Sequence, residues 1–390
     1  MRATPATVRE APIALFYFAN FATLGIALPY LALWLEHRGA GASWIGLVAA
    51  APSVVALVTT PLLGVWADRL GDWRSALVAG SWLSVTALSW WLLSLDPIDV
   101  LVVWTLCGVL SIAIAPVADA ATLALDKREL VSFGRIRAIG SVGYIAAVLI
   151  GGRLFDGDGI ERFLAALLVV GLARALCAHR LPPFRDHVPR GTTAAAAMPR
   201  SVEPAFLAVL CGAALVNAAH ATYYTFGLLH WQSIGIGTTI GARLWTVGIV
   251  LEILLMWRFR GIASRWSARH CLVVAGLCSV LRWSVTGLDP ALPVLVAVQC
   301  LHAVTFGLTF LAAVSYIARR GRDEAAARDQ ALYTTLSGTT LALATLAAGA
   351  LYERVGAGAY QLMTGLSVLG LLCLLASYRL DARTARTDPA

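Results

Sequence analysis

The sequence predicts an all-α membrane protein with twelve transmembrane helices in two pseudo-symmetric six-helix halves. Of its 390 residues, 59% are hydrophobic and 13% are charged, about half the ~25% charged fraction of a soluble domain. A helix that crosses a bilayer needs about 20 apolar residues, and the chain has twelve such windows. They are 12–35, 43–66, 75–95, 99–121, 136–155 and 160–180, followed by 204–227, 238–258, 270–288, 292–318, 331–351 and 358–380.

A Pro-, Arg- and Ala-rich segment without apolar periodicity separates six windows from six. We therefore expect a first half over 1–180, a cytoplasmic linker over 181–203, a second half over 204–380 and a cytoplasmic tail over 381–390. The halves also resemble each other, since GVWADRLGDWR, which begins at Gly64, aligns with GIASRWSARH, which begins at Gly261. Repeated six-helix halves with a site between them near the midplane are typical of secondary transporters.

The cations of the chain indicate how it lies in the membrane. Lys and Arg total 30 against 22 Asp and Glu. They occur in short runs between apolar windows, which argues against a nucleic-acid binder with its cations on one face. With the N-terminus in the cytoplasm, the outer loops hold only Arg38, Arg153, Arg162 and Arg354. The positive-inside rule thus predicts a multi-pass protein of the bacterial cytoplasmic (inner) membrane, with both termini cytoplasmic.

The sequence lacks the motifs of common enzyme classes. It has no P-loop, no GxGxxG after a strand, no Ser nucleophile elbow and no cluster of metal ligands. We therefore expect no enzymatic activity, no cofactor and no metal. The expected partners are a small-molecule substrate, protons and the lipid bilayer, with no nucleic acid, and the expected oligomeric state is a monomer.

A charged loop follows the second predicted helix. Its pattern GxxxDRxGDxR contains Gly64, Asp68, Arg69, Gly71 and Arg74. This pattern resembles the signature loop of the major facilitator superfamily, and the resemblance implies a cytoplasmic gate latched by charge pairs. The second copy has Arg265 in place of the Asp, which argues against a symmetric latch. The alternative is an ordinary basic turn.

A second motif opens the fifth predicted helix. The run FGRIRAIGSVGY, from Phe133 to Tyr144, resembles the lactose permease branch of this superfamily (oligosaccharide:proton symporters). It resembles the bacterial 3-phenylpropionic acid transporter subfamily still more. The second half adds HATYY at 220–224, WQ at 231–232, LRW at 281–283 and QxxH at 299–302. The resemblance covers nearly the whole chain outside the linker and tail, and it implies the major facilitator fold.

The second half places the ionisable residues His220, Glu252, Arg282 and His302 inside predicted membrane helices. At membrane depth such groups cost on the order of a few kcal/mol or more each, so they need partners or a wet cavity. Glu252 and Arg282 are expected to form an ion pair. The resemblance implies that Glu252, Arg282 and His302 couple protons, as Glu, Arg and His do in the lactose permease branch. The alternative is a polar network that only holds helices together.

Residues of the second half are also predicted to bind the substrate. Asn217, His220 and Tyr224 are three and four positions apart, so they share one helix face. Gln299 and His302 share another face by the same spacing. Polar and aromatic stripes of this kind suit a cavity for a small solute with a ring and a polar group.

The first half adds five predicted substrate-binding residues. Arg137 has a planar fork that binds carboxylates bidentately, although an ordinary positive-inside arginine is an equal alternative. The resemblance implies that Asp119 pairs with Arg137 to hold substrate and that Tyr144 stacks on it. Tyr17 and Asn20, three positions apart, are predicted to line the same cavity.

Proton-coupled symport of a small organic solute is the expected function. The resemblance implies an aromatic monocarboxylate such as 3-phenylpropionate, and alternating access of the two halves. A sugar or nucleoside symporter would share every motif, and Asp119 would repel an anion unless Arg137 neutralises it. A proton-driven exporter or a non-transporting sensor on the same fold are further alternatives.

Overall fold

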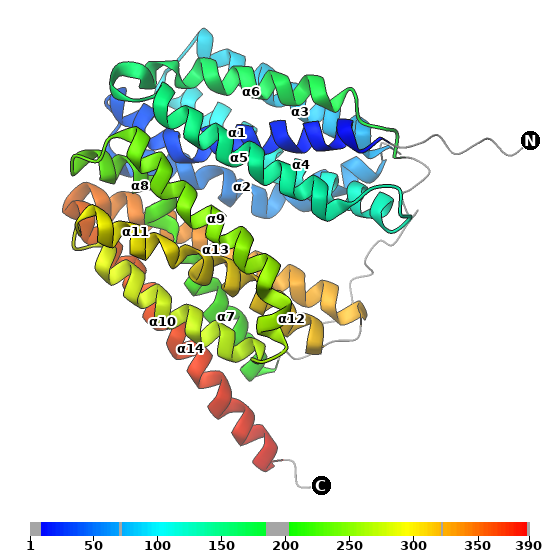
Figure 1. Ribbon diagram of the computed structural model, residues 1–390, viewed down its shortest axis with the longest axis vertical. Coiled ribbons are helices and arrows are strands. Elements are labelled where there is room, and N and C mark those ends of the chain that lie inside the picture. Colours follow the sequence, from blue (N-terminus) through cyan, green and yellow to red (C-terminus); the bar gives the residue numbers. More distant parts are fainter. Residues whose placement is uncertain (1–8, 70–71, 185–202, 321–322, 388–390) are drawn as a thin grey trace, which may run out of the picture. The chain divides into compact units, whose positions relative to one another are not determined.

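The computed structural model describes residues 9–69, 72–184, 203–320 and 323–387, and all regular elements in these ranges are helices (Figure 1). This confirms the predicted all-α class. The first part of the chain forms α1 (Glu10–His37), α2 (Ala42–Arg69), α3 (Trp73–Ser89), α4 (Pro97–Asp126), α5 (Phe133–Leu154) and α6 (Phe163–Ala178). The second forms α7 (Pro204–Ala218), α8 (Ala221–Ser233), α9 (Thr238–Ala263), α10 (Ala268–Thr286), α11 (Leu292–Cys300), α12 (Thr309–Arg320), α13 (Asp323–Val355) and α14 (Ala359–Thr387).

Ten helical stretches of the described chain are long and apolar enough to cross a membrane. Two features account for the difference from the predicted twelve. The stretch Arg328–Ala382 has 55 residues and contains parts of both α13 and α14. Helix α6 has 16 residues, fewer than the ~20 that span a bilayer core. The multi-pass class is confirmed, and the count of twelve stays a prediction.

The chain divides into two compact units. The first comprises Met1–His37 and Ala51–Ala196, and the second comprises Arg38–Ala50 and Ala197–Ala390. The start of α2 thus groups with the second unit, where the Ser43 N–H donates a hydrogen bond to Glu353 (2.8 Å). The predicted linker at 181–203 stays a prediction, because residues 185–202 lie outside the described ranges.

In the first unit, α1 packs closely along α5, and glycines of α5 make this possible. A Cβ on Gly143 would lie 2.9 Å from Phe18 Cα and closer still to the Phe18 carbonyl oxygen. A Cβ on Gly140 would lie 2.9 Å from the Phe21 ring. Membrane helices associate largely by van der Waals packing, and small residues allow the close approach. This interface fixes the spacing between the functional residues of α1 and α5.

The variant Gly143→Ala is expected to destabilise this unit by about 1–3 kcal/mol, because the added methyl overlaps backbone atoms. Denaturant titration of purified protein, followed by Trp fluorescence, measures the loss. Gly134→Ala is the control on the same helix, since a Cβ there would meet no atom within 4 Å. Equal stabilities of the two variants would contradict the close α1–α5 contact.

Two predicted helices are interrupted near ionisable residues. The predicted helix over 204–227 is split into α7 and α8, with His220 in the N-cap position of α8. The predicted helix over 292–318 contains a π-helical turn, Ala303–Leu308, directly after His302. Such turns insert an extra residue and are frequent at functional sites. Each stretch still forms a single span by length and composition, Pro204–Ser233 and Leu292–Arg319, because hydropathy does not register a local change of helical pitch.

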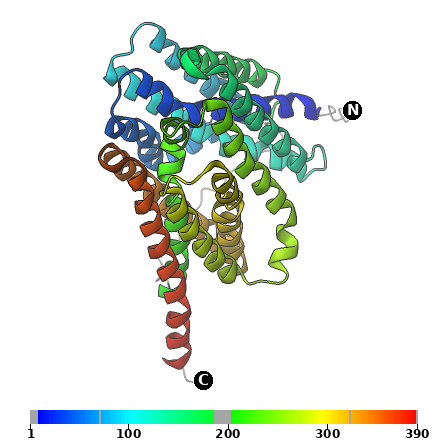
Figure 2. The same cartoon turned by 60° about the vertical axis from the view of Figure 1, so that its left-hand side comes forward.

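Helix α14 continues to Thr387, so most of the predicted tail 381–390 is helical. Both views show this helix extending beyond the other helices of the second unit (Figures 1 and 2). Asp381 in the extension forms a salt bridge with Arg269 of α10. The Arg269 guanidinium also lies 5.3 Å from the centre of the Tyr378 ring. These contacts attach the start of the extension to the body of the unit.

Candidate functional site

Arg282 is the centre of a buried polar cluster in the second unit. Its side chain projects from α10 and is fully buried. One terminal nitrogen, Nη1, is 3.1 Å from His302 Nδ1 and donates to Thr305 Oγ1 (2.9 Å). The other, Nη2, donates to Gln299 Oε1 (2.9 Å). Its guanidinium also lies over the Trp283 ring, 4.2 Å from the centroid, so cation–π attraction adds to the hydrogen bonds.

Glu252 reaches this cluster through His302. Its carboxylate Oε2 lies 3.6 Å from His302 Nε2, whereas Arg282 contacts the opposite ring nitrogen. The predicted Glu252–Arg282 ion pair is therefore replaced by a row of three groups with the imidazole in the middle. Glycines allow the approach, because a Cβ on Gly248 would lie 2.9 Å from His302 Cβ and one on Gly307 would lie 3.0 Å from Glu252 Cγ.

Hydrogen-bond polarity specifies where the imidazole protons lie. A guanidinium can only donate, so His302 Nδ1 must accept from Arg282. The proton of a neutral His302 is then on Nε2, the nitrogen that faces Glu252. Thr305 Oγ1 likewise accepts from Arg282, which leaves its own proton for His220 Nε2 at 3.1 Å, a shorter contact than the 3.4 Å to the His302 carbonyl.

The same reasoning applies to His220. Its Nδ1 lies 3.1 Å from the backbone carbonyl oxygen of Asn217, which can only accept, so the ring proton belongs on Nδ1. Both imidazoles therefore fit this cluster in their neutral forms. Formal charge is then confined to Arg282 and, when it is ionised, Glu252.

Replacing Thr305 with Val is expected to lower stability by about 1–3 kcal/mol, because the change removes an acceptor from Arg282 and a donor from His220 at buried positions. Denaturant titration of the purified protein measures the loss. Thr309→Val is the control four residues on, since the Thr309 hydroxyl donates only to the Thr305 carbonyl oxygen, and Thr305→Ser should recover most of the stability. Equal losses in the two Val variants would contradict the bridging role of Thr305.

The remaining predicted residues of the second unit border the cluster. Gln299 donates to the Tyr223 hydroxyl (3.0 Å) while it accepts from Arg282. Tyr224 stacks on His220 with ring centres 5.5 Å apart. The Asn217 amide donates to Ser337 Oγ of α13 (3.0 Å). The structure therefore brings all seven predicted residues of this unit into one connected region.

The first unit holds a smaller polar group. The Tyr17 hydroxyl donates to Asp119 Oδ1 (2.7 Å) and lies 3.3 Å from Thr122 Oγ1. Arg137 lies over the Phe21 ring, 4.1 Å from its centroid. Among the described residues no ion pair joins Asp119 and Arg137, so the joint role of these two residues in holding substrate stays a prediction. Asp119 is bound by a tyrosine of α1 instead, and Arg137 stacks on an aromatic ring of the same helix.

The other two predicted residues of the first unit, Asn20 and Tyr144, lie on α1 and α5. Asn20 is buried on α1, one turn from Tyr17. Tyr144 is half-buried on α5, where its carbonyl oxygen would lie 2.6 Å from a Cβ on Gly25. Tyr144 therefore contributes its backbone to the α1–α5 contact, and its role toward a substrate stays a prediction.

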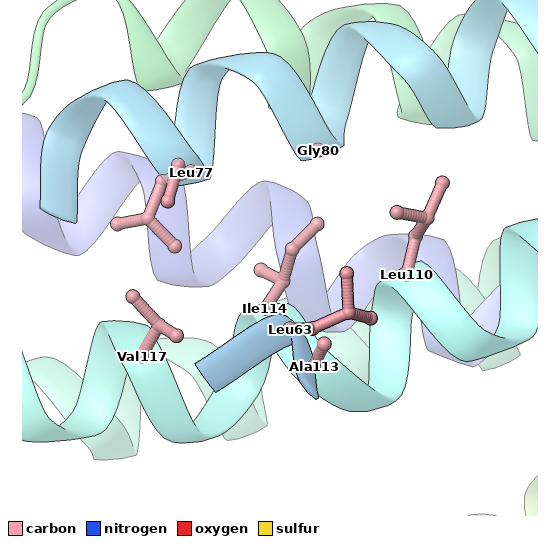
Figure 3. Close-up of a pocket in the computed structure, with 8 residues that line it drawn as sticks. Leu63, Leu77, Gly80, Leu110, Ala113, Ile114 and Val117 are labelled. Carbon is pink, nitrogen blue, oxygen red and sulfur yellow. The ribbon is translucent and has the colours of Figure 1, made fainter. Parts of the chain in front are cut away.

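A cavity of about 30 Å³ lies in the first unit against α3 and α4 (Figure 3). Its lining consists of Leu63, Ala76, Leu77, Gly80, Leu110, Ala113, Ile114 and Val117. Every one of these side chains is apolar or absent. Since solute sites combine an apolar wall with a few placed polar groups, this cavity is a packing gap rather than a binding site.

Comparison with known proteins identifies the family. The family model described as "MFS_1 like family" matches residues 11–362. The chain belongs to this family. It is thus a multi-pass membrane transporter of the major facilitator superfamily and not an enzyme.

The similar individual proteins are also named as transporters. The "Probable 3-phenylpropionic acid transporter" of Escherichia coli (strain K12) is 31% identical over 368 residues, which cover 90% of this chain and 93% of that protein. The maltose permease of Geobacillus stearothermophilus is 28% identical over 95% of each chain. The crystal structure of the nucleoside transporter NupG has a TM-score of 0.81 at 15% identity, over 95% of this chain and 98% of that one. The structural likeness supports the fold alone.

The signature loop of this major facilitator transporter is described in part. Gly71 lies outside the described residues, the surroundings of Gly64 and the side chain of Asp68 are not described, and Arg69 is exposed at the end of α2. Arg74 donates to the His179 carbonyl oxygen (2.6 Å). The predicted charge latch therefore stays a prediction.

Asp72, within the same loop, has a defined role. It caps α3 by accepting from the Arg74 N–H (3.0 Å) and also accepts from the Phe184 N–H (3.0 Å). The capping bond satisfies a helix N–H that has no partner within the helix. The second bond attaches the chain that follows α6 to the start of α3.

Sequence reasoning missed two residues of the transporter's main cluster, namely Thr305 and Tyr223. Thr305 bridges two predicted residues, and the Tyr223 ring lies 4.5 Å from the stacked Trp245 ring. Thr305 is three positions after His302, and Tyr223 is three after His220. That spacing was an available signal, but threonines and aromatics are common in membrane helices and carry no charge that needs explanation.

Proposed function

We propose that this transporter is a proton-coupled symporter of a small organic solute, an aromatic monocarboxylate such as 3-phenylpropionate. One observation carries the coupling: a buried imidazole, His302, lies between the carboxylate of Glu252 and the guanidinium of Arg282. An ionised Glu252 is attracted by the ring N–H and by the cation beyond it. A protonated Glu252 loses that attraction, so uptake and release of a proton alter the contacts between α9, α10 and the π-helical turn.

Glu252 is the member of this row best placed to exchange protons. Its side chain is 15% exposed, against 5% for the side chain of His302, and Arg282 is fully buried. The hydrogen bond from Arg282 fits a neutral His302, and the hydrogen bond from Thr305 fits a neutral His220. Coupling would follow if bound solute favours one protonation state of Glu252, because the two equilibria are then linked.

Arg137 is the proposed carboxylate-binding residue. It is half-buried and has no carboxylate partner among the described residues, because Asp119 is bound by Tyr17. A guanidinium next to an aromatic ring suits a solute that carries both a carboxylate and a ring. The name of the Escherichia coli relative supports the same class of solute. The polar and aromatic residues around Arg282 and Tyr17 complete the proposed substrate-binding set.

We further propose that the protein functions as a monomer in the bacterial inner membrane with both termini in the cytoplasm. The positive-inside distribution of arginines supports this orientation. The alternatives for the solute are a sugar or a nucleoside, as the names of the maltose permease and NupG indicate. Export by proton exchange is the alternative for direction.

Uptake into proteoliposomes tests the proposal. Initial rates for labelled 3-phenylpropionate, maltose and a nucleoside are compared with and without an inward proton gradient, and empty liposomes correct for passive entry of the protonated acid. Gradient-stimulated uptake of 3-phenylpropionate alone is the expected result. If the gradient stimulates uptake of only the sugar or the nucleoside, the proposed proton coupling stands and the proposed class of solute is wrong.

Within that assay, Arg137→Gln is expected to raise the KM for 3-phenylpropionate roughly 10- to 100-fold, the loss of a hydrogen-bonded charge. Arg135→Gln is the matched control two positions away, since its side chain is 69% exposed and pairs with Glu10. Equal KM values for the two variants would remove Arg137 from the binding site.

A further inference from the structure

A second arginine is buried between helices of the first unit. Arg174 lies on α6 and is 2% exposed. Among the residues that the structure describes, its one hydrogen bond runs from Nη1 to Ser111 Oγ of α4 at 3.4 Å, and its Nε has no hydrogen-bond partner. The proposed coupling and substrate-binding mechanism uses neither Arg174 nor Ser111.

Arg174 lacks a protein counter-charge. No ion pair involves it among the described residues, in contrast to Arg282, which has a carboxylate one side chain away. Cys107 of α4 is nearby, but its thiol donates to the Ser84 carbonyl oxygen (3.4 Å), so it is a neutral donor and not a thiolate. An unpaired charge at membrane depth is strongly unfavourable, and a buried cation is therefore expected to bind an anion.

Helix α3 supplies a further hydrogen-bond donor at the level of Ser111. Ser81 of α3 is fully buried, and its hydroxyl has no hydrogen-bond partner. The antiparallel register of α3 and α4 places Ser81 at the level of Ser111, because Ser84 meets Cys107 and a Cβ on Gly80 would lie 3.3 Å from Ile114. Helices α3 and α6 also contact each other at this level, where a Cβ on Gly171 would lie 3.4 Å from Val85.

We propose that Arg174, Ser111 and Ser81 form a binding site for a small monovalent anion such as chloride. The guanidinium would supply the charge and the free Nε–H, and each hydroxyl would direct its proton at the ion. The bound anion would connect α3, α4 and α6 and neutralise the charge that α6 buries. The site is separate from the apolar cavity of Figure 3, whose lining offers no donor.

Chloride binding to the purified full-length protein tests the site. Thermal midpoints are measured against sodium chloride that replaces sodium gluconate at constant ionic strength, and binding of radioactive chloride is measured directly. Wild type is expected to gain stability saturably with chloride and to bind it. Ser81→Ala and Ser111→Ala should each weaken the apparent affinity about tenfold, the loss of one hydrogen bond to a charge.

Arg174→Gln should abolish both responses, whether its own midpoint is higher or lower than that of wild type. Arg153→Gln, an exposed arginine on α5, should retain them. Equal midpoints of wild type in chloride and gluconate, without specific chloride binding, would overturn the proposal. So would a chloride response that both serine variants retain unchanged. The proposed symport does not enter these readouts, so its failure would leave them intact.

Discussion

The variant Glu252→Gln loses proton-driven uptake and retains counterflow of solute. Gln has the shape of Glu and can keep an oxygen where Glu252 Oε2 lies, 3.6 Å from His302 Nε2 in the native protein. It cannot take up or release a proton. For one proton per solute, each unit of pH difference supports an accumulation of about tenfold, and this gain should vanish in the variant.

The measurement compares two assays on the same proteoliposomes. The initial uptake rate under an inward proton gradient should fall to the rate without a gradient, while exchange of internal for external solute persists at equal pH. Glu161→Gln is the control, since the Glu161 side chain is 75% exposed just before the start of α6. If the proton gradient stimulates uptake by Glu252→Gln as strongly as uptake by wild type, Glu252 takes no part in coupling. Loss of counterflow as well would assign it to binding or folding.

The second large effect is expected at Arg282. Arg282→Met should destabilise the protein by about 3–5 kcal/mol, because it leaves buried hydrogen-bond acceptors on His302, Thr305 and Gln299 without their donor and an ionised Glu252 without a nearby cation. Titration with a denaturing detergent in mixed micelles measures the change. Arg243→Met is the control on α9, since Arg243 is exposed.

The double variant Glu252→Gln/Arg282→Met separates charge from packing. If Arg282 stabilises Glu252 through His302, removing the carboxylate charge should recover at least about 1 kcal/mol of the Arg282→Met loss, because neighbouring sites are not additive. Additive losses in the double variant would contradict electrostatic coupling across the imidazole. A loss below about 1 kcal/mol for Arg282→Met alone would contradict its central place in the cluster.

Residue patterns predicted the membrane-embedded members of this cluster but not their partners. His220, Glu252, Arg282 and His302 are noticeable in the sequence because charge is rare in apolar windows. Opposite charge suggested a direct Glu252–Arg282 pair, and the structure instead places His302 between them. In the first unit the family resemblance joined Asp119 to Arg137, whereas Tyr17 donates a hydrogen bond to Asp119 in the structure.

The sequence by itself determined the class of this protein, its apolar helices and the ionisable residues inside them. These properties follow from the cost of placing polar groups in hydrocarbon, which each segment incurs regardless of its neighbours. Only the tertiary structure decided which side chains meet, including the bridge by Thr305 and the contact of Arg174 with Ser111, and where the helix breaks at His220. Such contacts depend on the rotation and register of packed helices, and a shift of one residue turns a side chain by about 100° around the helix.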